Sequence, residues 1–176
     1  MAEQQIVCAG FGGQGILSMG KFLAYAGMDS NKNVSWLPSY GPEMRGGTAN
    51  CSVVVSDDLV GSPVVTHLDS AIVMNRPSLD KFEPMLKPGG LLIMDSDLVN
   101  RMPERDDITV IAVPAQTEAE KIGNKRIANM VLLGAYVAKT GIVTLESLVL
   151  ALKDHGKANF FEANEKAIAK GAEYAK

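Results

Sequence analysis

The sequence predicts an α/β fold in three layers, with a mainly parallel sheet and a helical carboxyl end, built as a single domain over residues 1–176. Short apolar runs alternate with amphipathic segments through the first two thirds of the chain, as parallel strands joined by helices do. A glycine-rich turn follows the first apolar run and opens a helical pattern, which makes the expected domain Rossmann-like. After Pro114 only helical patterns remain.

Six strands are expected, each a short apolar run that ends at a polar residue, a glycine or a proline. They cover residues 5–9, 33–37, 48–56, 71–75, 91–95 and 108–113. Pro38 is expected to end the second strand, because proline cannot donate a hydrogen bond to a sheet ladder. The segment Lys87-Pro88-Gly89-Gly90 is typical of a turn and precedes the fifth strand.

Six helices are expected where apolar residues recur every three or four positions. They cover residues 16–27, 77–85, 115–122, 126–139, 145–153 and about 159–174. Thr144 and Asn159 are expected to cap the last two, and Gly123-Asn124 separates the third helix from the fourth. Lys125 and Arg126 open the fourth helix against its dipole, which indicates a ligand or a partner there unless both side chains are simply solvated.

The composition excludes several classes of protein. The chain holds 17 Lys and Arg against 20 Asp and Glu, a net charge of −3, and no dense basic cluster that would attract nucleic acid. Its longest apolar stretches fall short of the roughly 20 residues that a membrane span needs. Residues 1–5 lack the basic and apolar regions of a secretory signal. We therefore expect a cytoplasmic protein with no nucleic-acid partner and no membrane span.

Cysteines and histidines are too few for a metal site within the chain. An iron–sulfur cluster needs about four thiolates, and only Cys8 and Cys51 are present, each in an apolar run. The two histidines, His67 and His155, have no carboxylate or cysteine at ligand spacing. No convincing pair of nucleophile and base is found either, so we expect no catalytic residue and no metal ligand in this chain.

The glycine turn is the first candidate binding site. Gly10-Phe11-Gly12-Gly13-Gln14-Gly15 matches the pattern G-x-G-x-x-G between a strand and a helix, where backbone amides and the helix N-terminus face an anion. A dinucleotide would also require an acid at the end of the second strand, but that strand ends in uncharged residues and Asp29 precedes it. A phosphate-bearing ligand and a purely structural turn therefore remain as the main alternatives.

A second candidate site follows the second strand. Its segment Ser39-Tyr40-Gly41-Pro42-Glu43-Met44-Arg45-Gly46-Gly47-Thr48 lies at the carboxyl end of that strand, where open α/β sheets bind ligands. The Arg45 guanidinium beside Gly46 and Gly47 suits a carboxylate or a phosphate, with Tyr40 close by in sequence. The alternative is that Glu43 and Arg45 form an ordinary exposed ion pair.

The two motifs together, residues 10–15 and 36–50, resemble the γ subunit of 2-oxoacid:ferredoxin oxidoreductases. The resemblance continues through Asn75-Arg76-Pro77, Pro88-Gly89-Gly90 and residues 123–130 into the last helix, and so covers most of the chain. The sequence of residues 34–51 is most similar to that of γ subunits of the 2-oxoglutarate enzyme, 2-oxoglutarate synthase. The pyruvate and branched-chain enzymes have closely related subunits, and these remain alternative assignments.

The resemblance implies a division of labour among subunits. Enzymes of this family decarboxylate a 2-oxoacid on thiamine diphosphate, pass electrons through iron–sulfur clusters to ferredoxin or a similar acceptor, and form an acyl-coenzyme A. Thiamine diphosphate, Mg²⁺ and the 4Fe-4S clusters would reside in partner subunits, and this chain alone would bind no cofactor and be inert. The implied partners are the α and β subunits, with a δ subunit as an open alternative.

Coenzyme A, the co-substrate, is the family ligand whose phosphates could use the two candidate sites. The residues expected to face it are Gly10, Gly12, Gly13, Gln14, Gly15, Tyr40, Arg45, Gly46 and Gly47. Two other interpretations stay open. Both loops could instead dock the α and β subunits, since glycine-rich loops that carry aromatic side chains also suit interfaces. The chain could also be a stand-alone nucleotide-binding module, and a dehydrogenase domain that uses NAD or FAD is the weakest reading.

Overall fold

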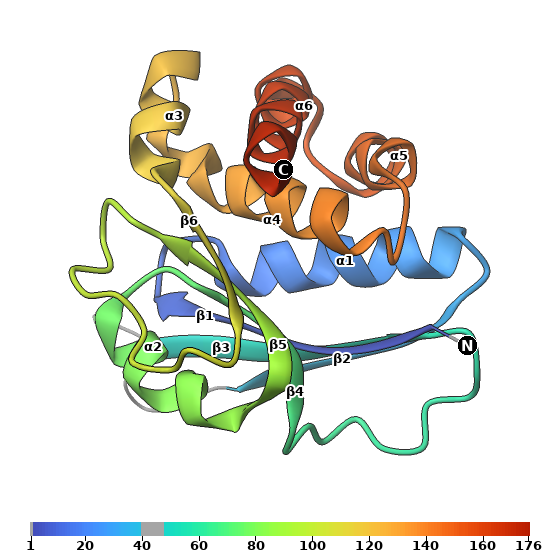
Figure 1. Cartoon of the computed structure of the whole chain (residues 1–176). Coiled ribbons are helices and arrows are strands. Elements are labelled where there is room, and N and C mark those ends of the chain that lie inside the picture. Colours follow the sequence, from blue (N-terminus) through green and yellow to red (C-terminus); the bar gives the residue numbers. More distant parts are fainter. Residues whose placement is uncertain (1, 40–47) are drawn as a thin grey trace.

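The computed structural model describes residues 2–39 and 48–176, which fold around one six-stranded sheet (Figure 1). The strands are β1 (Glu3–Phe11), β2 (Asn33–Ser39), β3 (Thr48–Ser56), β4 (Leu68–Val73), β5 (Leu86–Asp95) and β6 (Thr109–Val113). The helices are α1 (Ile16–Asp29), α2 (Arg76–Phe82), α3 (Ala115–Ile122), α4 (Ala128–Thr140), α5 (Leu145–His155) and α6 (Ala158–Ala172). Three short 3-10 helices, η1 (Glu83–Met85), η2 (Lys125–Ile127) and η3 (Glu173–Ala175), complete the list.

The sheet is mixed, in the order β2-β3-β1-β4-β5-β6. β1, β4, β5 and β6 run parallel, whereas β3 is antiparallel to both of its neighbours, β1 and β2. The expected α/β fold with a mainly parallel sheet is therefore confirmed. The reversal of β3 has a simple cause: only residues 40–47 separate it from β2, and a parallel crossover needs a dozen or more residues.

One edge of the sheet collects the carboxyl ends of β1, β2, β4 and β5. β2 belongs there because it is antiparallel to β3, which is itself antiparallel to β1. The glycine turn begins at this edge directly after β1, and Phe11 at the end of β1 pairs with Thr48 at the start of β3. The flanks of both candidate sites therefore lie next to each other in the fold.

Helices cover the two faces of the sheet unequally. α1, α3, α4, α5 and α6 lie on one face, and α2 with η1 lies on the other (Figure 1). α4 is the centre of the larger layer, because every residue from 128 to 137 is buried between the sheet and α6. A smaller cluster around Leu79 and Phe82 packs on the opposite face. The three expected layers are present, with one of them thin.

Two glycines bring α4 and α6 into close contact. A Cβ atom added to Gly171 would collide with the backbone carbonyl oxygen of Val131, and one added to Gly134 would collide with the backbone of Ile168. Backbone atoms cannot move aside as a flexible side chain can. Glycine at these two positions therefore sets how near the two helices approach each other.

Two expectations about strand ends were wrong. β2 continues through Pro38, which lies opposite Cys51, because β2 is an edge strand on which the missing N–H of proline can face away from the ladder. The segment Lys87-Pro88-Gly89-Gly90 lies within β5 instead of before it. Pairing with β4 shifts there from Leu68 opposite Leu86 to Ser70 opposite Leu91, so the expected turn is a bulge in the strand.

Helix caps agree with the sequence at some ends and differ at others. The Thr144 hydroxyl accepts a hydrogen bond from the backbone N–H of Ser147 at 3.0 Å and caps α5, as expected. Asn75 caps α2 by accepting from the N–H of Ser78 at 2.8 Å. The expected cap at Asn159 was wrong, because α6 begins at Ala158 and Lys157 occupies its N-cap position without a side-chain bond.

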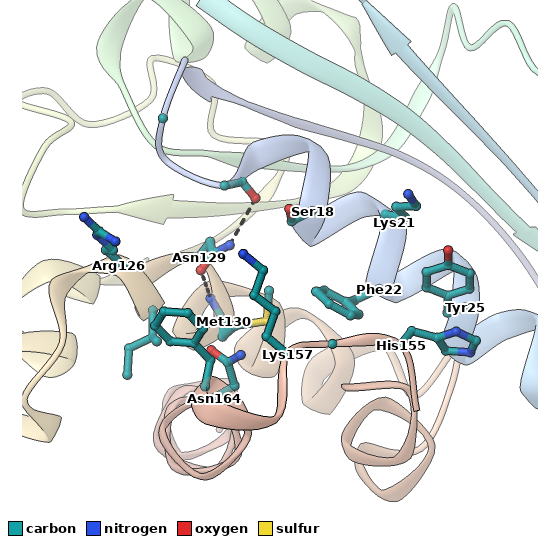
Figure 2. A pocket seen from close by; sticks show the side chains of 15 residues that line it. Ser18, Lys21, Phe22, Tyr25, Arg126, Asn129, Met130, His155, Lys157 and Asn164 are labelled. Atoms are coloured by element: carbon teal, nitrogen blue, oxygen red, sulfur yellow. Dashed lines mark hydrogen bonds between the residues drawn. The ribbon is translucent and has the colours of Figure 1, made fainter. Parts of the chain in front are cut away.

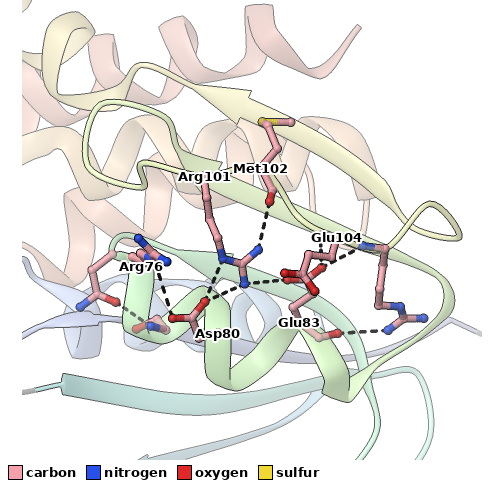
Figure 3. Close-up of polar contacts among 9 residues, drawn as sticks. Arg76, Asp80, Glu83, Arg101, Met102 and Glu104 are labelled. Carbon is pink, nitrogen blue, oxygen red and sulfur yellow. Dashed lines mark hydrogen bonds and ion pairs between the residues drawn. The ribbon is translucent and has the colours of Figure 1, made fainter.

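A network centred on Glu83 fixes the loop between β5 and β6 (Figure 3). The buried Glu83 carboxylate accepts hydrogen bonds from the backbone N–H groups of Glu104 at 2.6 Å and Arg105 at 3.0 Å, and from Arg101 at 2.9 Å. Arg101 also pairs with Asp80 of α2. Burial raises the pKa of Glu83, but these donors together outweigh burial and hold the pKa below its usual range.

The contact between α4 and α6 predicts the effect of adding one methyl group. We expect Gly171→Ala to lower the free energy of unfolding by about 1–3 kcal/mol, because the new Cβ meets backbone that cannot yield. Gly61→Ala is the control, since a Cβ there meets no atom within 4 Å. Urea denaturation of the two variants should separate them, and equal stability would contradict the assigned contact.

The Glu83 network predicts a pH dependence of stability. Because the folded state lowers the pKa of Glu83, its charged form stabilises the fold above pH 4.5, the ordinary value, and this contribution is lost as the pH falls through the lower folded value. We expect Glu83→Gln to cost about 1–3 kcal/mol at pH 7 and less at pH 3. Glu162→Gln, on the exposed surface of α6, should show no such difference. A pH-independent cost for Glu83→Gln would contradict the assignment.

Candidate functional site

The glycine turn joins β1 to α1 and depends on two left-handed residues. Gly13 has φ of 90° and Gly15, the N-cap residue of α1, has φ of 72°. Residues with a Cβ rarely adopt these angles, so the pattern of glycines seen in the sequence has a direct backbone cause. The turn therefore presents bare backbone to its surroundings.

Gln14 braces the turn from inside. Its side-chain Oε1 accepts a hydrogen bond from the N–H of Phe11 at 2.6 Å, and its Nε2 donates to the carbonyl oxygen of Met74 at 3.4 Å. A Cβ on Gly10 would lie 2.5 Å from that Oε1, so glycine at position 10 makes room for the brace. Both polar atoms of Gln14 are thus engaged within the protein.

The amides of the turn are available to a ligand. Within residues 2–39 and 48–176, no acceptor is found for the backbone N–H groups of Gly12, Gly13 or Gly15. α1 has no side-chain cap and no acidic residue in its first turn. The positive end of the α1 dipole is therefore not neutralised by any described side chain, which favours an anion at this position.

A groove of about 610 Å³ opens beside the turn (Figure 2). Three parts of the chain form its walls: the turn with α1, the start of α4 with η2, and the connection between α5 and α6. The lining residues are Gly13, Gly15, Ser18, Lys21, Phe22, Tyr25, Arg126, Ile127, Asn129, Met130, His155, Gly156, Lys157, Phe160 and Asn164.

The groove carries positive charge and no acid among its lining residues. Lys21, Arg126 and Lys157 contribute cationic side chains, and no ion pair to any of the three is found in the described part of the chain. Figure 2 shows Lys157 reaching toward Asn129, with Arg126 and Lys21 on opposite sides of that residue. An anion with more than one charged group suits this arrangement.

Aromatic and apolar side chains form the rest of the groove. Phe22, Phe160 and Met130 line it, and Tyr25 stacks on His155 with ring centroids 3.9 Å apart and an interplanar angle of 7°. His155 also lies 3.5 Å from the Asp29 carboxylate. Cationic groups beside apolar walls are the combination that binds a phosphorylated ligand with a ring or an alkyl portion.

The structure brings together some of the predicted site residues. Gly13 and Gly15 line the groove, Gly12 and Gln14 belong to the same turn, and Gly10 packs beneath it. The other predicted residues, Tyr40, Arg45, Gly46 and Gly47, lie outside the described residues. Arg126, which the sequence marked as an unusual basic residue at a helix start, is part of the groove.

Sequence reasoning missed Lys21, Lys157, Phe160 and Asn129. A signal for Lys21 existed, because Ser18, Lys21 and Tyr25 recur at the spacing of one helix face directly after the glycine turn. No pattern in the sequence places Lys157 and Phe160 opposite that face, since they reach it only through the packing of α6.

The buried Asp95 and the two cysteines have structural surroundings. Burial raises the pKa of the Asp95 carboxyl, although the hydrogen bond from Gln116 acts in the opposite direction. The Asp95 carboxylate also accepts a hydrogen bond from the N–H of Asp97 at 3.1 Å, and this bond stabilises the turn after β5. Cys8 and Cys51 lie opposite each other on β1 and β3 and are fully buried. The Cys51 contact and then burial raise the pKa of the Cys8 thiol, as suits an inert thiol.

No group of three or more His, Cys, Asp and Glu side chains among the described residues could hold a metal ion. No helix in the described ranges is both long and apolar enough to cross a membrane.

Comparisons with known proteins agree with one another. A family model described as pyruvate ferredoxin/flavodoxin oxidoreductase matches residues 5–174. The chain is 40% identical to the ketoisovalerate oxidoreductase subunit VorA of Methanothermobacter thermautotrophicus, with 99% of this chain and 37% of VorA aligned. It is 37% identical to the 2-oxoglutarate synthase subunit KorC of Methanocaldococcus jannaschii, with 99% and 95% aligned. The chain therefore spans little more than a third of VorA but nearly all of KorC.

Solved structures share the fold. A keto/oxoacid ferredoxin oxidoreductase γ subunit from Geobacter sulfurreducens superposes with a TM-score of 0.86 at 34% identity, and 98% of each chain is covered. A 2-oxoglutarate:ferredoxin oxidoreductase from Magnetococcus marinus, solved with 2-oxoglutarate, coenzyme A and succinyl-CoA, gives a TM-score of 0.88 at 24% identity. That match covers 99% of this chain and 31% of the other, and it supports the fold alone.

The charge of the groove predicts binding of a simple polyanion. We expect inorganic pyrophosphate to bind the isolated chain with an affinity that falls as salt is added. Arg126→Ala should weaken this binding about tenfold, since a hydrogen bond to a charged group contributes about 1.5–3 kcal/mol. Arg76→Ala removes the same charge on α2, outside the groove, and should have little effect. Calorimetric titration would measure both, and equal losses would rule out the groove as the binding place.

Proposed function

This chain belongs to the pyruvate ferredoxin/flavodoxin oxidoreductase family, and we propose that it is the γ subunit of a 2-oxoglutarate:ferredoxin oxidoreductase. In this role it supports the oxidative decarboxylation of the 2-oxoacid to an acyl-coenzyme A. Thiamine diphosphate, Mg²⁺ and the 4Fe-4S clusters belong to the partner subunits.

The choice of 2-oxoglutarate is supported by two observations. The sequence of residues 34–51 resembles that of γ subunits of the 2-oxoglutarate enzyme, and the match to KorC extends over nearly the whole of both chains. A second candidate, a branched-chain 2-oxoacid, is favoured by the 40% identity to VorA, although that match covers only part of VorA. Because both acids are candidates, the assay must include both of them.

The cationic groove is the observation that carries the proposed role of this chain. Coenzyme A joins a diphosphate and a 3′-phosphate to an adenine ring and an apolar arm, and the groove offers cations and free amides beside aromatic walls. We assign the phosphates to the amides of the glycine turn and to Lys21, Arg126 and Lys157. The aromatic side chains Phe22 and Phe160 would contact the adenine or the pantetheine arm.

We also assign Tyr40, Arg45, Gly46 and Gly47, which lie outside the described residues, to the same ligand. The two flanks of this segment, Ser39 and Thr48, lie at the sheet edge where the glycine turn begins. A guanidinium at position 45 would add a further phosphate contact. The alternative is that residues 40–47 dock the α and β subunits. A substitution would then impair assembly of the complex before turnover, whereas loss of a phosphate contact would raise KM for coenzyme A.

The proposal implies specific partners. The α and β subunits, with a δ subunit in enzymes that have four types, would surround this chain, and ferredoxin or a similar acceptor would take electrons through them. In VorA the region that matches this chain is about a third of a longer chain.

Purification of the tagged chain with its partner subunits tests the function. We expect the complex to oxidise 2-oxoglutarate with a viologen acceptor only when coenzyme A is present, and to use pyruvate and 2-oxoisovalerate more slowly. Faster turnover of 2-oxoisovalerate would move the assignment to the branched-chain enzyme. A partnerless, inactive homo-oligomer would contradict the subunit role and favour a stand-alone binding module.

The assignment of the groove is tested in the same complex. Arg126→Ala should raise KM for coenzyme A about tenfold and leave KM for the 2-oxoacid unchanged, because the guanidinium is assigned to phosphate alone. Arg76→Ala should change neither value. Two further variants test residues 40–47. An unchanged KM for coenzyme A in Arg45→Ala would contradict the phosphate contact assigned to Arg45. Loss of subunit assembly in Tyr40→Ala before any loss of turnover would indicate that the segment docks the partner subunits.

A further inference from the structure

Asn129 joins two segments that are 114 residues apart in sequence. Its side-chain Nδ2 donates a hydrogen bond to the carbonyl oxygen of Gly15 at 3.0 Å, and its Oδ1 accepts one from the N–H of Met130 at 2.9 Å. The residue is 6% exposed. Both ends of the amide are therefore used, and the side chain has one orientation that satisfies them.

The Gly15 carbonyl is where this bond has its effect. The same oxygen accepts from the N–H of Met19 at 2.9 Å, the first backbone bond of α1. A carbonyl oxygen has two lone pairs, so these two donors saturate it and fix the peptide that links Gly15 to Ile16. Gly13 and Gly15 line the groove, and no described group accepts from their N–H groups.

Space at Gly15 is reserved for Asn129. A Cβ added to Gly15 would lie 2.5 Å from Nδ2 and 3.3 Å from Cγ of Asn129. The left-handed φ of 72° would strain any other residue there as well. Two requirements, a backbone angle and a neighbouring side chain, therefore meet at one glycine.

α1 has no capping side chain of its own to hold this geometry. Its N-cap residue is Gly15, so the bond that a Ser, Thr or Asp side chain would normally supply at the start of a helix is missing. The amide from α4 ties the helix start to the rest of the fold instead. It also places the turn at a set distance from Arg126, which precedes Asn129 by three residues.

We infer that Asn129 is a positioning residue: its amide holds Gly15 and the start of α1 so that the amides of the glycine turn face the anion in the groove. Asn129 also lines the groove, but its positioning role acts through the turn, by way of the bond to the Gly15 carbonyl. The kinetic part of this inference rests on the proposed function, whereas the effect on the turn itself does not.

Hydrogen exchange on the folded chain tests the effect on the turn. In Asn129→Ala, the peptide covering residues 12–20 should exchange faster than in the wild type, while peptides from β4 and α2 stay unchanged. Asn129→Asp is the second variant, because its carboxylate can still accept from Met130 but cannot donate to Gly15. Unchanged exchange over residues 12–20 in both variants would overturn the inference, whatever the complex does with coenzyme A.

Kinetics of the assembled enzyme separate positioning from general stability. Asn129→Ala should raise KM for coenzyme A about tenfold with kcat altered less than about twofold, since ground-state binding is what it loses. Thr144→Ala is the matched control: it removes the cap bond of α5 and some stability, but it does not line the groove. An equal rise of KM in both variants, or no rise in Asn129→Ala, would show a role in stability only.

A double-mutant cycle tests the direct contact. Gly15→Ala introduces the backbone strain in any background, but its Cβ meets Nδ2 only when Asn129 is present. The penalty of Gly15→Ala on KM for coenzyme A should therefore be smaller in the Asn129→Ala background than in the wild type. Strictly additive effects would contradict the contact. If neither single variant changed KM for coenzyme A while Arg126→Ala did, the positioning role of Asn129 would be wrong and the assignment of the groove would stand.

Discussion

The burial of α4 is the constraint on which the rest of the structure depends. All ten residues from 128 to 137 are buried, so the helix can shift neither toward solvent nor along its axis without exposing apolar surface. Gly134 on α4 and Gly171 on α6 let these two helices approach until backbones touch. With α4 held on both sides, its first turn has one available position, directly beside the glycine turn that leaves β1.

This constraint explains how three distant parts of the chain make one groove. η2 and the first turn of α4 supply Arg126 and Asn129, α1 supplies Lys21, and the connection into α6 supplies Lys157. Three cations that line one groove repel one another when no anion is bound, and no ion pair to any of them is found among the described residues. The packing of buried helices supplies the energy that keeps them together, and a polyanion in the groove would relieve the repulsion.

The carboxyl edge of the sheet also carries exposed apolar side chains, outside the cationic groove. The loop between β5 and β6 is held by Glu83, Arg101 and Arg105, and it carries the exposed side chains of Leu98 and Met102. Phe11 and Leu37, also exposed, lie on β1 and β2 toward the same carboxyl edge. A loop held by such a network loses little conformational entropy when another surface covers its apolar side chains, which suits the subunit role proposed for this chain.

The sequence by itself determined the local features of this protein. The strands, the helices, the left-handed glycines of the turn and the cap at Thr144 follow from backbone geometry and from spacing within a few residues, and the family resemblance follows from the same motifs. Errors occurred where neighbours in space overrule local preference, as for Pro38 on an edge strand and for residues 87–90 in a bulge. Only the tertiary structure decided the direction of β3, the meeting of Lys21, Arg126 and Lys157, and the bond from Asn129 to Gly15. These depend on how buried surfaces pack across more than a hundred residues of chain, and no periodicity within one segment encodes that packing.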